Sequence, residues 1–475
     1  MAALHDLSAT ELGRAYAARA LSPVDVARAV LAHIERWEPH LHATWALDAE
    51  AALAQARASE ARWQRSEGLG PLDGVPVTIK ENIATRGTAV PLGTAASELV
   101  PAAEDAPPAA RLREAGAVIL CKTTMPDYGM LSSGLSSFHQ LARNPWDRSK
   151  NPGGSSAGAG AAAAAGYGPL HLGTDIGGSI RLPAAWCGVV GLKPSAGRVP
   201  IKPPYLGRVA GPMTRSVADA ALLMATLSLP DDRDATRLPF ERLPWTSLER
   251  DDAPTSLRGL RIGLLLDAGW GLPVEPATRA AVEDAARRFE AAGALVEPMQ
   301  PFTTREMADG INLFWRVRSH LDISALPPKR RDKVLPFIRQ WVAAGARASA
   351  AELFQGYSQF AALRDAAVAA CGRFDFVISP VAPGVAFDAT WAMPTNDPER
   401  AMEHIAFTLP FNMSEQPAVS VPAGHDSRGL PIGLQIIGAR HDDLGVLRIA
   451  RAWEQLRAPL RLNPIRNVRG NIILI

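Results

Sequence analysis

Hydrophobic positions along the chain follow helical spacing in some segments and strand-like runs in others. Apolar residues at helical spacing predict helices over about 24–37 and 48–66, after a capping box at Ser8 and Glu11. Short apolar or β-branched runs predict strands at 72–79, 118–121, 170–172, 261–266, 294–296, 374–379, 417–421 and 434–437, with further helices at 277–292 and 443–456. Strands that alternate with helices favour an α/β sheet covered on both faces.

Composition narrows the class of protein. The 475 residues suggest about three domains at ~150 residues each. The 50 Lys and Arg nearly balance the 48 Asp and Glu, which argues against binding of nucleic acid or anionic membrane through bulk charge. The apolar content of 47% argues against disorder. Because we see no secretory signal and no apolar run of the ~18–20 residues that a membrane span needs, we expect a cytoplasmic protein.

The three cysteines, Cys121, Cys187 and Cys371, are widely separated and form no CxxC pair. This spacing disfavours a disulfide framework or a zinc site. Each cysteine is expected to be a small buried apolar residue. We therefore expect no metal ion and no cofactor from this part of the sequence.

Glycine and serine cluster at 151–160, just before an alanine-rich helix former. A glycine-rich turn that leads into a helix has two interpretations, a phosphate cradle or a tight turn whose small residues allow close packing. No Gly-Lys-Ser/Thr follows, and no clean GxGxxG follows a strand, so nucleotide binding is disfavoured.

A second glycine- and serine-rich element at 173–181 follows the predicted strand 170–172. The backbone N–H groups of Ile176, Gly177, Gly178 and Ser179 could converge on one point there, because two glycines let the chain bend. Such a cradle suits the oxyanion of a tetrahedral acyl intermediate. Ser179 would then be a candidate nucleophile.

A nucleophilic serine needs a base. His139 and His171 are nearest in sequence, but both have the setting of ordinary surface or core histidines. Lys80 ends the apolar run 75–79 and is one of only seven lysines. It is either a solvated strand end or a desolvated amine, whose lowered pKa would let it act as a base.

Several segments together resemble the amidase signature family of hydrolases, over nearly the whole chain. They are GVPVTIKEN at 74–82, NPWD at 144–147, GGSSAG at 153–158, GTDIGGSIR at 173–181, CGVVGLKP at 187–194, GPMTR at 211–215, QPAVSVP at 416–422 and GLPIGLQ at 429–435. The resemblance implies one α/β/α domain over 1–475, with a mixed twisted sheet of about ten strands. Within it, 1–66 would be a helical N-terminal region, 72–215 the signature core, and 255–475 the rest of the sheet and pocket.

The resemblance also implies a Ser–Ser–Lys triad. Ser179 would attack the amide carbonyl and form an acyl-enzyme, while Ser155 would relay its proton to a neutral Lys80. The family's cis peptide bond would be Gly154–Ser155. The resemblance places the oxyanion hole at the N–H groups of 176–179, assigns Asp175 and Arg181 to holding the loop, and implies no metal or cofactor.

For the substrate, the resemblance points to Met130, Ser132 and Thr174. Met130 and Ser132 would line the acyl pocket or serve in packing, and Thr174 would touch the substrate or close the turn. Segment 301–400 resembles the family least. Its aromatic side chains would line an apolar pocket or belong to the core, and they are Phe314, Trp315, Trp341, Phe354, Tyr357, Phe360 and Trp391.

The leading functional interpretation is a stand-alone amidase that hydrolyses a small-molecule carboxamide to a carboxylic acid and ammonia or an amine. It would have no nucleic-acid or membrane partner, and a homodimer is one option. The first alternative is the glutamine-hydrolysing amidase subunit of a tRNA-dependent amidotransferase, which shares the whole signature. The second is a non-catalytic binding protein on the same scaffold.

Overall fold

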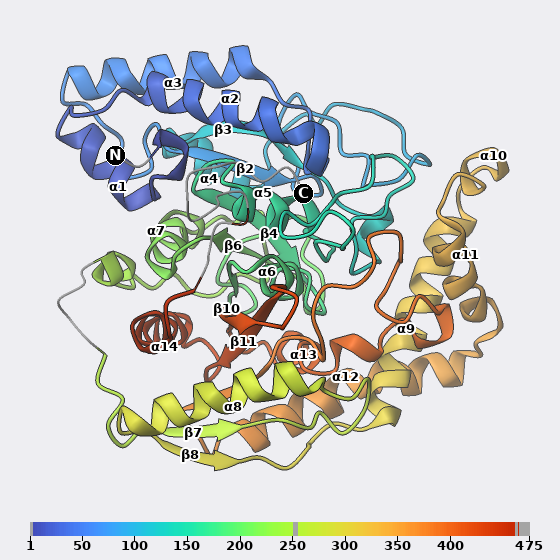
Figure 1. The fold of residues 1–475 in the computed structure, drawn as a ribbon. Helices are drawn as coiled ribbons and strands as arrows, with labels where there is room; N and C mark the ends of the chain where they lie inside the picture. Colours follow the sequence, from blue (N-terminus) through green and yellow to red (C-terminus); the bar gives the residue numbers. More distant parts are fainter. Residues whose placement is uncertain (1–2, 250–254, 461–463, 465–475) are drawn as a thin grey trace.

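A mixed sheet of eleven strands runs through the computed structural model, which describes residues 3–249, 255–460 and 464 (Figure 1). In spatial order the strands are β1 (Thr44–Trp45), β3 (Val118–Thr123), β2 (Pro76–Lys80), β4 (Leu170–Asp175), β6 (Val209–Thr214), β5 (Val190–Lys193), β10 (Ala418–His425), β11 (Pro431–Ile437), β9 (Phe376–Pro380), β7 (Arg261–Leu264) and β8 (Leu295–Pro298). The expected single α/β domain with a mixed sheet is confirmed. The three-domain expectation from length is wrong, because one continuous sheet joins the N-terminal and C-terminal halves.

Helices surround this sheet (Figure 1). They are α1 (Ala9–Ala17), α2 (Pro23–Leu41), α3 (Ala49–Gln64), α4 (Pro107–Glu114), α5 (Ala157–Ala165), α6 (Arg181–Cys187), α7 (Val217–Leu227), α8 (Pro276–Ala291), α9 (Arg305–Ser324), α10 (Pro328–Arg331), α11 (Pro336–Ala343), α12 (Ala350–Cys371), α13 (Leu409–Met413) and α14 (Asp443–Leu456). The N-terminal helices α1–α3 lie at one end of the sheet, and β7, β8 and α8 lie at the other (Figure 1). The predicted segment 255–475 continues past residue 460, where all but residue 464 lies outside the described residues.

Local sequence signals explain where the first helices begin. Ser8 and Glu11 form the predicted capping box of α1, with each side chain bonded to the other residue's backbone N–H. Ser22 caps α2 by accepting hydrogen bonds from the N–H groups of Val24 and Asp25. None of the helices in the described ranges is long and apolar enough to cross a membrane.

Helix α5 lies in the interior, and every one of its residues is buried. Its glycines allow backbones to approach closely. A side chain at Gly158 would place its Cβ 2.1 Å from the carbonyl oxygen of Ala43, and one at Gly154, in the turn before α5, would lie 2.5 Å from the backbone nitrogen of Ser133. The tight-turn interpretation of the glycine and serine cluster is therefore confirmed.

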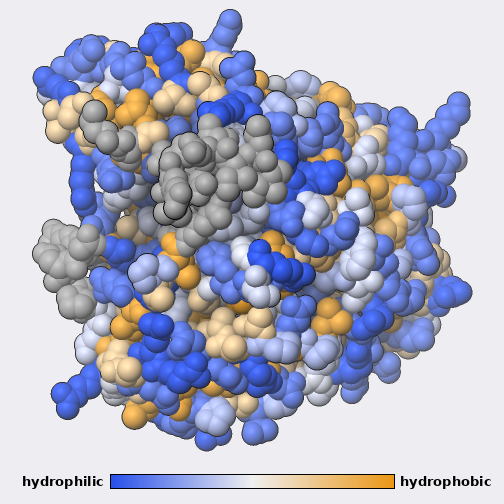
Figure 2. Space-filling view, in the orientation of Figure 1, coloured by the Kyte–Doolittle hydropathy of each residue, from blue (hydrophilic) through white to orange (hydrophobic). Residues whose placement is uncertain are grey.

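The surface mixes hydrophobic and hydrophilic side chains, and the cysteines match their predicted character. On the face shown in Figure 2, hydrophobic side chains lie in small groups between hydrophilic ones. The three cysteines are buried and free, and none forms a disulfide within the described part of the chain.

The register of the sheet decides where the chemistry lies. Strands β2 and β4 are parallel neighbours, with Ile79 opposite Leu172. Both strands therefore end at the same edge of the sheet, which brings Lys80 close to Thr174. Helix α5 begins beside them, directly after Ser155 and Ser156.

Candidate active site

Lys80 is the last residue of β2, and its side chain is fully buried. The solvated strand-end interpretation is therefore wrong. The Lys80 Nζ donates hydrogen bonds to Ser155 Oγ at 2.8 Å, to Ser156 Oγ at 3.0 Å and to Thr174 Oγ1 at 2.9 Å. The lysine amine thus sits in a cage of hydroxyl oxygens, and no described carboxylate lies within ion-pair distance of it.

Burial lowers the pKa of the Lys80 ammonium to about 7. The carboxylate of Asp175 opposes this shift, and the positive charge of Arg208 adds to it. Because the lysine is partly neutral near pH 7, its nitrogen has a lone pair that can accept a proton from the hydroxyl of Ser155.

Lys80 is not the only buried lysine. Lys122 and Lys193 are also buried, and desolvation lowers the pKa of each to about 7. Lys122 donates to the carbonyl of Ile83 and to Thr85, whereas Lys193 donates to the carbonyl of Pro194. Burial therefore does not distinguish Lys80 from these two lysines, whereas its contacts with the serine hydroxyls do.

Ser155 and Ser156 join the two glycine-rich elements. The Gly154–Ser155 peptide bond is cis. The N–H of Ser156 donates to the carbonyl of Ser179 at 3.1 Å, and Ser156 Oγ donates to the carbonyl of Thr174. Ser155 and Ser179 line one cavity, but among the hydrogen bonds of the described residues none joins their hydroxyls. Ser156 escaped the sequence prediction, although it stands beside Ser155 in the same cluster.

Asp175 holds the loop that carries Ser179. Its carboxylate accepts hydrogen bonds from the N–H groups of Gly178 at 2.8 Å and Ile180 at 3.0 Å, and it pairs with the Arg181 guanidinium at 2.9 Å. Burial alone would raise the pKa of the Asp175 carboxyl, but the charge and hydrogen bonds of Arg181 hold it well below its usual range. Arg181 in turn donates to the carbonyl of Thr408 and to Gln435 Oε1.

Three of the four predicted oxyanion donors remain available. The N–H of Gly178 is used by Asp175, whereas those of Ile176, Gly177 and Ser179 have no hydrogen-bond partner in the described structure. Gly178 has φ of +127°, and a Cβ there would lie 2.7 Å from Thr408 Oγ1. Glycine is required at this position by both the conformation and the space.

The cavity that holds these groups has a volume of about 620 Å³. Met130, Ser132 and Thr174 all line it. Thr174 also closes the turn, since its hydroxyl accepts hydrogen bonds from Lys80 and from Asn82 Nδ2 at 3.0 Å. Thr174 therefore closes the turn, and its contact with a substrate stays a prediction.

Only part of the aromatic set reaches the cavity. Trp315 and Trp341 line it, whereas Phe354 is 72% exposed. Phe314, Tyr357 and Phe360 pack against one another between α9 and α12. Four charged residues that line the cavity escaped the sequence prediction because no motif marks them, and they are Lys202, Arg208, Arg318 and Asp322.

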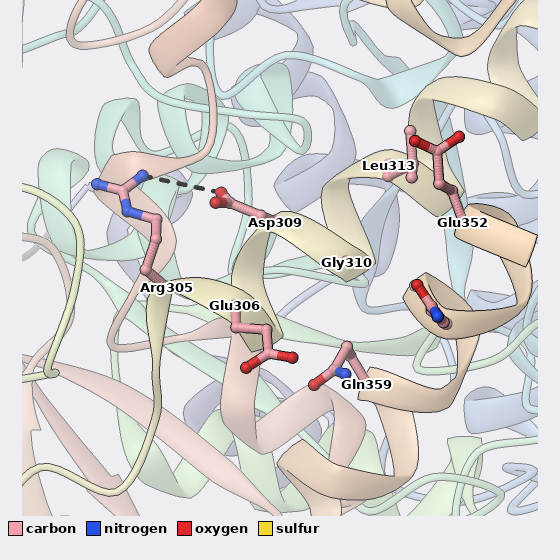
Figure 3. Close-up of a pocket in the computed structure, with 9 residues that line it drawn as sticks. Arg305, Glu306, Asp309, Gly310, Leu313, Glu352 and Gln359 are labelled. Atoms are coloured by element: carbon pink, nitrogen blue, oxygen red, sulfur yellow. Dashed lines mark ion pairs between the residues drawn. The ribbon is translucent and has the colours of Figure 1, made fainter. Parts of the chain in front are cut away.

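A second hollow of about 510 Å³ lies between α9 and α12 (Figure 3). Its lining residues include the ion pair between Arg305 and Asp309, together with Glu306 and Glu352. It shares no lining residue with the cavity around Ser179. The candidate catalytic residues Ser155 and Ser179 therefore line the first cavity and not this hollow.

Comparison with known proteins identifies one family. The amidase family model matches residues 25–447. The chain is 35% identical to a glutamyl-tRNA(Gln) amidotransferase subunit from Chloroflexus aggregans, over 96% of this chain and 97% of that protein. It is also 35% identical to the corresponding protein from Symbiobacterium thermophilum, over 98% and 99% of the two chains.

Solved structures give the same fold. A bacterial aryl acylamidase of the amidase signature family matches with a TM-score of 0.87 at 30% identity, over 96% of this chain and 97% of that one. The peptide amidase from Stenotrophomonas maltophilia matches with a TM-score of 0.82 at 28% identity, over 96% and 99%.

The stand-alone interpretation of the sequence is wrong. Curated relatives at 34–35% identity over nearly the whole chain are named as subunits of a glutamyl-tRNA(Gln) amidotransferase. The expected partners, which excluded nucleic acid and allowed only a homodimer, are wrong for the same reason. The signature motifs reflect the chemistry of amide cleavage, which stand-alone enzymes and amidotransferase subunits share, and so they do not report the assembly.

Removal of the Asp175 carboxylate tests the support of the loop. Asp175→Ala leaves the Arg181 guanidinium buried without its ion pair, and we expect the free energy of unfolding to fall by about 3–5 kcal/mol. Asp284→Ala, which removes a partly exposed ion pair on α8, should cost no more than about 0.5 kcal/mol. Urea denaturation of both variants makes the comparison, and equal losses would contradict this role for Asp175.

Proposed function

This chain belongs to the amidase signature family, whose members cleave C–N amide bonds, and we propose that it is the amidase subunit of an amidotransferase. In this role it hydrolyses the side-chain carboxamide of glutamine and releases ammonia for a partner enzyme in the cytoplasm. The observation that carries the proposal is the 34–35% identity to glutamyl-tRNA(Gln) amidotransferase subunits over nearly the full length of both chains.

The reaction begins at Ser179. Its hydroxyl oxygen attacks the carboxamide carbon, while the hydroxyl proton passes to Ser155 and the Ser155 proton passes to neutral Lys80. The hydrogen bond of 2.8 Å between Lys80 Nζ and Ser155 Oγ supports this route. The developing oxyanion is stabilised by the N–H groups of Ile176, Gly177 and Ser179.

Collapse of the tetrahedral intermediate breaks the C–N bond. Lys80 returns its proton through Ser155 to the leaving nitrogen, which departs as ammonia and leaves an ester on Ser179. Water then attacks the ester and gives its proton to Ser155 and Lys80. The carboxylic acid leaves when Ser179 regains its proton, so the enzyme returns to its starting state.

Loss of the nucleophile is the first test. Ser179→Ala should lower kcat for ammonia release from glutamine by at least about 10³-fold, because no acyl-enzyme can form. Ser358→Ala, on the exposed face of α12, is the matched control and should keep normal turnover. Ammonia release by both variants is measured with a coupled assay. Each tagged variant is purified from cells of the source organism, together with any subunits bound to it.

Two results would overturn the proposal. Near-normal glutamine turnover by Ser179→Ala would rule out Ser179 as the nucleophile. A chain that purifies without other subunits and releases no ammonia from glutamine, while it cleaves other amides, would remove the amidotransferase role.

The protonation of Lys80 gives the second test. The burial-lowered pKa of about 7 means that the lysine is charged below that pH and cannot accept the Ser155 proton. We therefore expect kcat/KM for glutamine to rise about tenfold per pH unit below pH 7 and to level off above it. A profile that is flat from pH 5 to 9 would rule out Lys80 as the base.

A further inference from the structure

The cavity around Ser179 has a charged region that the acyl-transfer mechanism does not use. Arg208, Arg318 and Asp322 line the cavity together with Lys202, whose ammonium pairs with Glu104. Arg208 lies directly before β6, whereas Arg318 and Asp322 lie one turn apart on α9. The segment before β6 and helix α9 thus bring two guanidinium groups and one carboxylate to the same space as the nucleophile.

Arg208 has no carboxylate partner within ion-pair distance among the described residues. Its guanidinium donates to the carbonyl oxygen of Pro203. Burial lowers the pKa of the Arg208 guanidinium, and the nearby charge of Arg318 lowers it further. A partly buried guanidinium beside a second one is unfavourable unless an anion joins them.

Arg318 is already positioned for such an anion. Its guanidinium carbon lies 4.4 Å from the centroid of the Tyr205 ring, which fixes the plane of the group. The Arg318 Nε lies 3.5 Å from Asp322 Oδ2. About half of each side chain in this pair stays exposed, so a ligand can reach both the positive and the negative group.

A second observation points to a ligand in the same cavity. Trp315 lies one turn before Arg318 on α9, and its indole ring approaches the space beside Gly177. The Trp315 Nε1–H is buried and has no hydrogen-bond partner among the described residues. A buried donor without an acceptor is costly, and a polar substrate would satisfy it.

We infer that Arg208 and Arg318 form a carboxylate-binding subsite, in which Asp322 accepts an ammonium group, so that the cavity holds an amide with an amino-acid head group. This inference rests on the proposed function and deepens it, since glutamine carries one carboxylate and one ammonium beyond its carboxamide. Guanidinium groups bind carboxylates through paired hydrogen bonds in which donor and acceptor are both charged, and an amide without a carboxylate cannot form that pair.

The test compares three amides that differ only in their charged groups. They are L-glutamine, glutaramate, which has the carboxylate alone, and butyramide, which has neither charge. Binding is measured by calorimetry on the Ser179→Ala protein, and kcat and KM are measured on the active enzyme. Arg208→Gln, Arg208→Lys and Arg318→Gln are compared with Arg287→Gln, an exposed arginine on α8.

With Arg208 and Arg318 both present, we expect glutaramate to bind the Ser179→Ala protein about ten- to one-hundredfold more tightly than butyramide does. Arg208→Gln should remove this preference by raising KM for glutaramate. Arg318→Gln should weaken the preference less, and Arg208→Lys should keep most of it. Arg287→Gln should leave the preference unchanged. Asp322→Asn should reduce only the preference for L-glutamine over glutaramate.

The inference is overturned if butyramide binds as well as glutaramate, if Arg208→Gln weakens both equally, or if none of the three amides binds. Arg318→Gln keeps the test valid if Arg208→Gln does not fold, because Arg318 is half-exposed. If glutaramate is preferred in an Arg208-dependent way but glutamine is not hydrolysed, the subsite stands and the glutamine proposal fails.

Discussion

The site depends on the burial of one primary amine among neutral oxygens. Lys80 is fully buried, and its Nζ contacts the hydroxyls of Ser155, Ser156 and Thr174. A carboxylate in direct contact would stabilise the ammonium and keep the proton on the lysine. The cage of hydroxyl groups provides hydrogen bonds without that charge, so burial sets the pKa near 7.

The fold creates this environment with the parallel pair of β2 and β4. Because both strands end at one edge of the sheet, the end of β2 delivers Lys80 to the start of the loop that carries Ser179. The nearest strong charge, Asp175, is committed to Arg181 and to the loop's N–H groups. The same ion pair thus shapes the loop and limits the effect of Asp175 on the lysine.

Much of the fold was predictable because its strands are apolar runs with clear ends, as at 118–121 and 434–437. No elements were predicted in most of segment 301–400, where α9 and α12 pack mainly against each other. The buried residues of α12 have helical spacing, but apolar residues such as Phe354 and Val368 also lie on its exposed side, which weakens the amphipathic signal.

The site was predictable only where its residues are close in sequence or belong to the signature. Lys80, Ser155 and Ser179 were found from motifs. The Asp175 carboxylate accepts a hydrogen bond from the Gly178 N–H because its side chain folds back on its own loop. A sequence motif does not record that conformation. Arg208 gave no signal because Arg318 and Asp322, which line the cavity with it, lie more than a hundred residues away in the sequence.

The most direct measurement of the central claim is the titration of the Lys80 amine itself. Protein labelled with ¹³C at the lysine Cε positions gives one NMR signal per lysine, and the Lys80→Met variant identifies the signal of Lys80. We predict a midpoint near pH 7. A Lys80 signal that stays in its charged form up to pH 10 would contradict the role of a neutral lysine as the base.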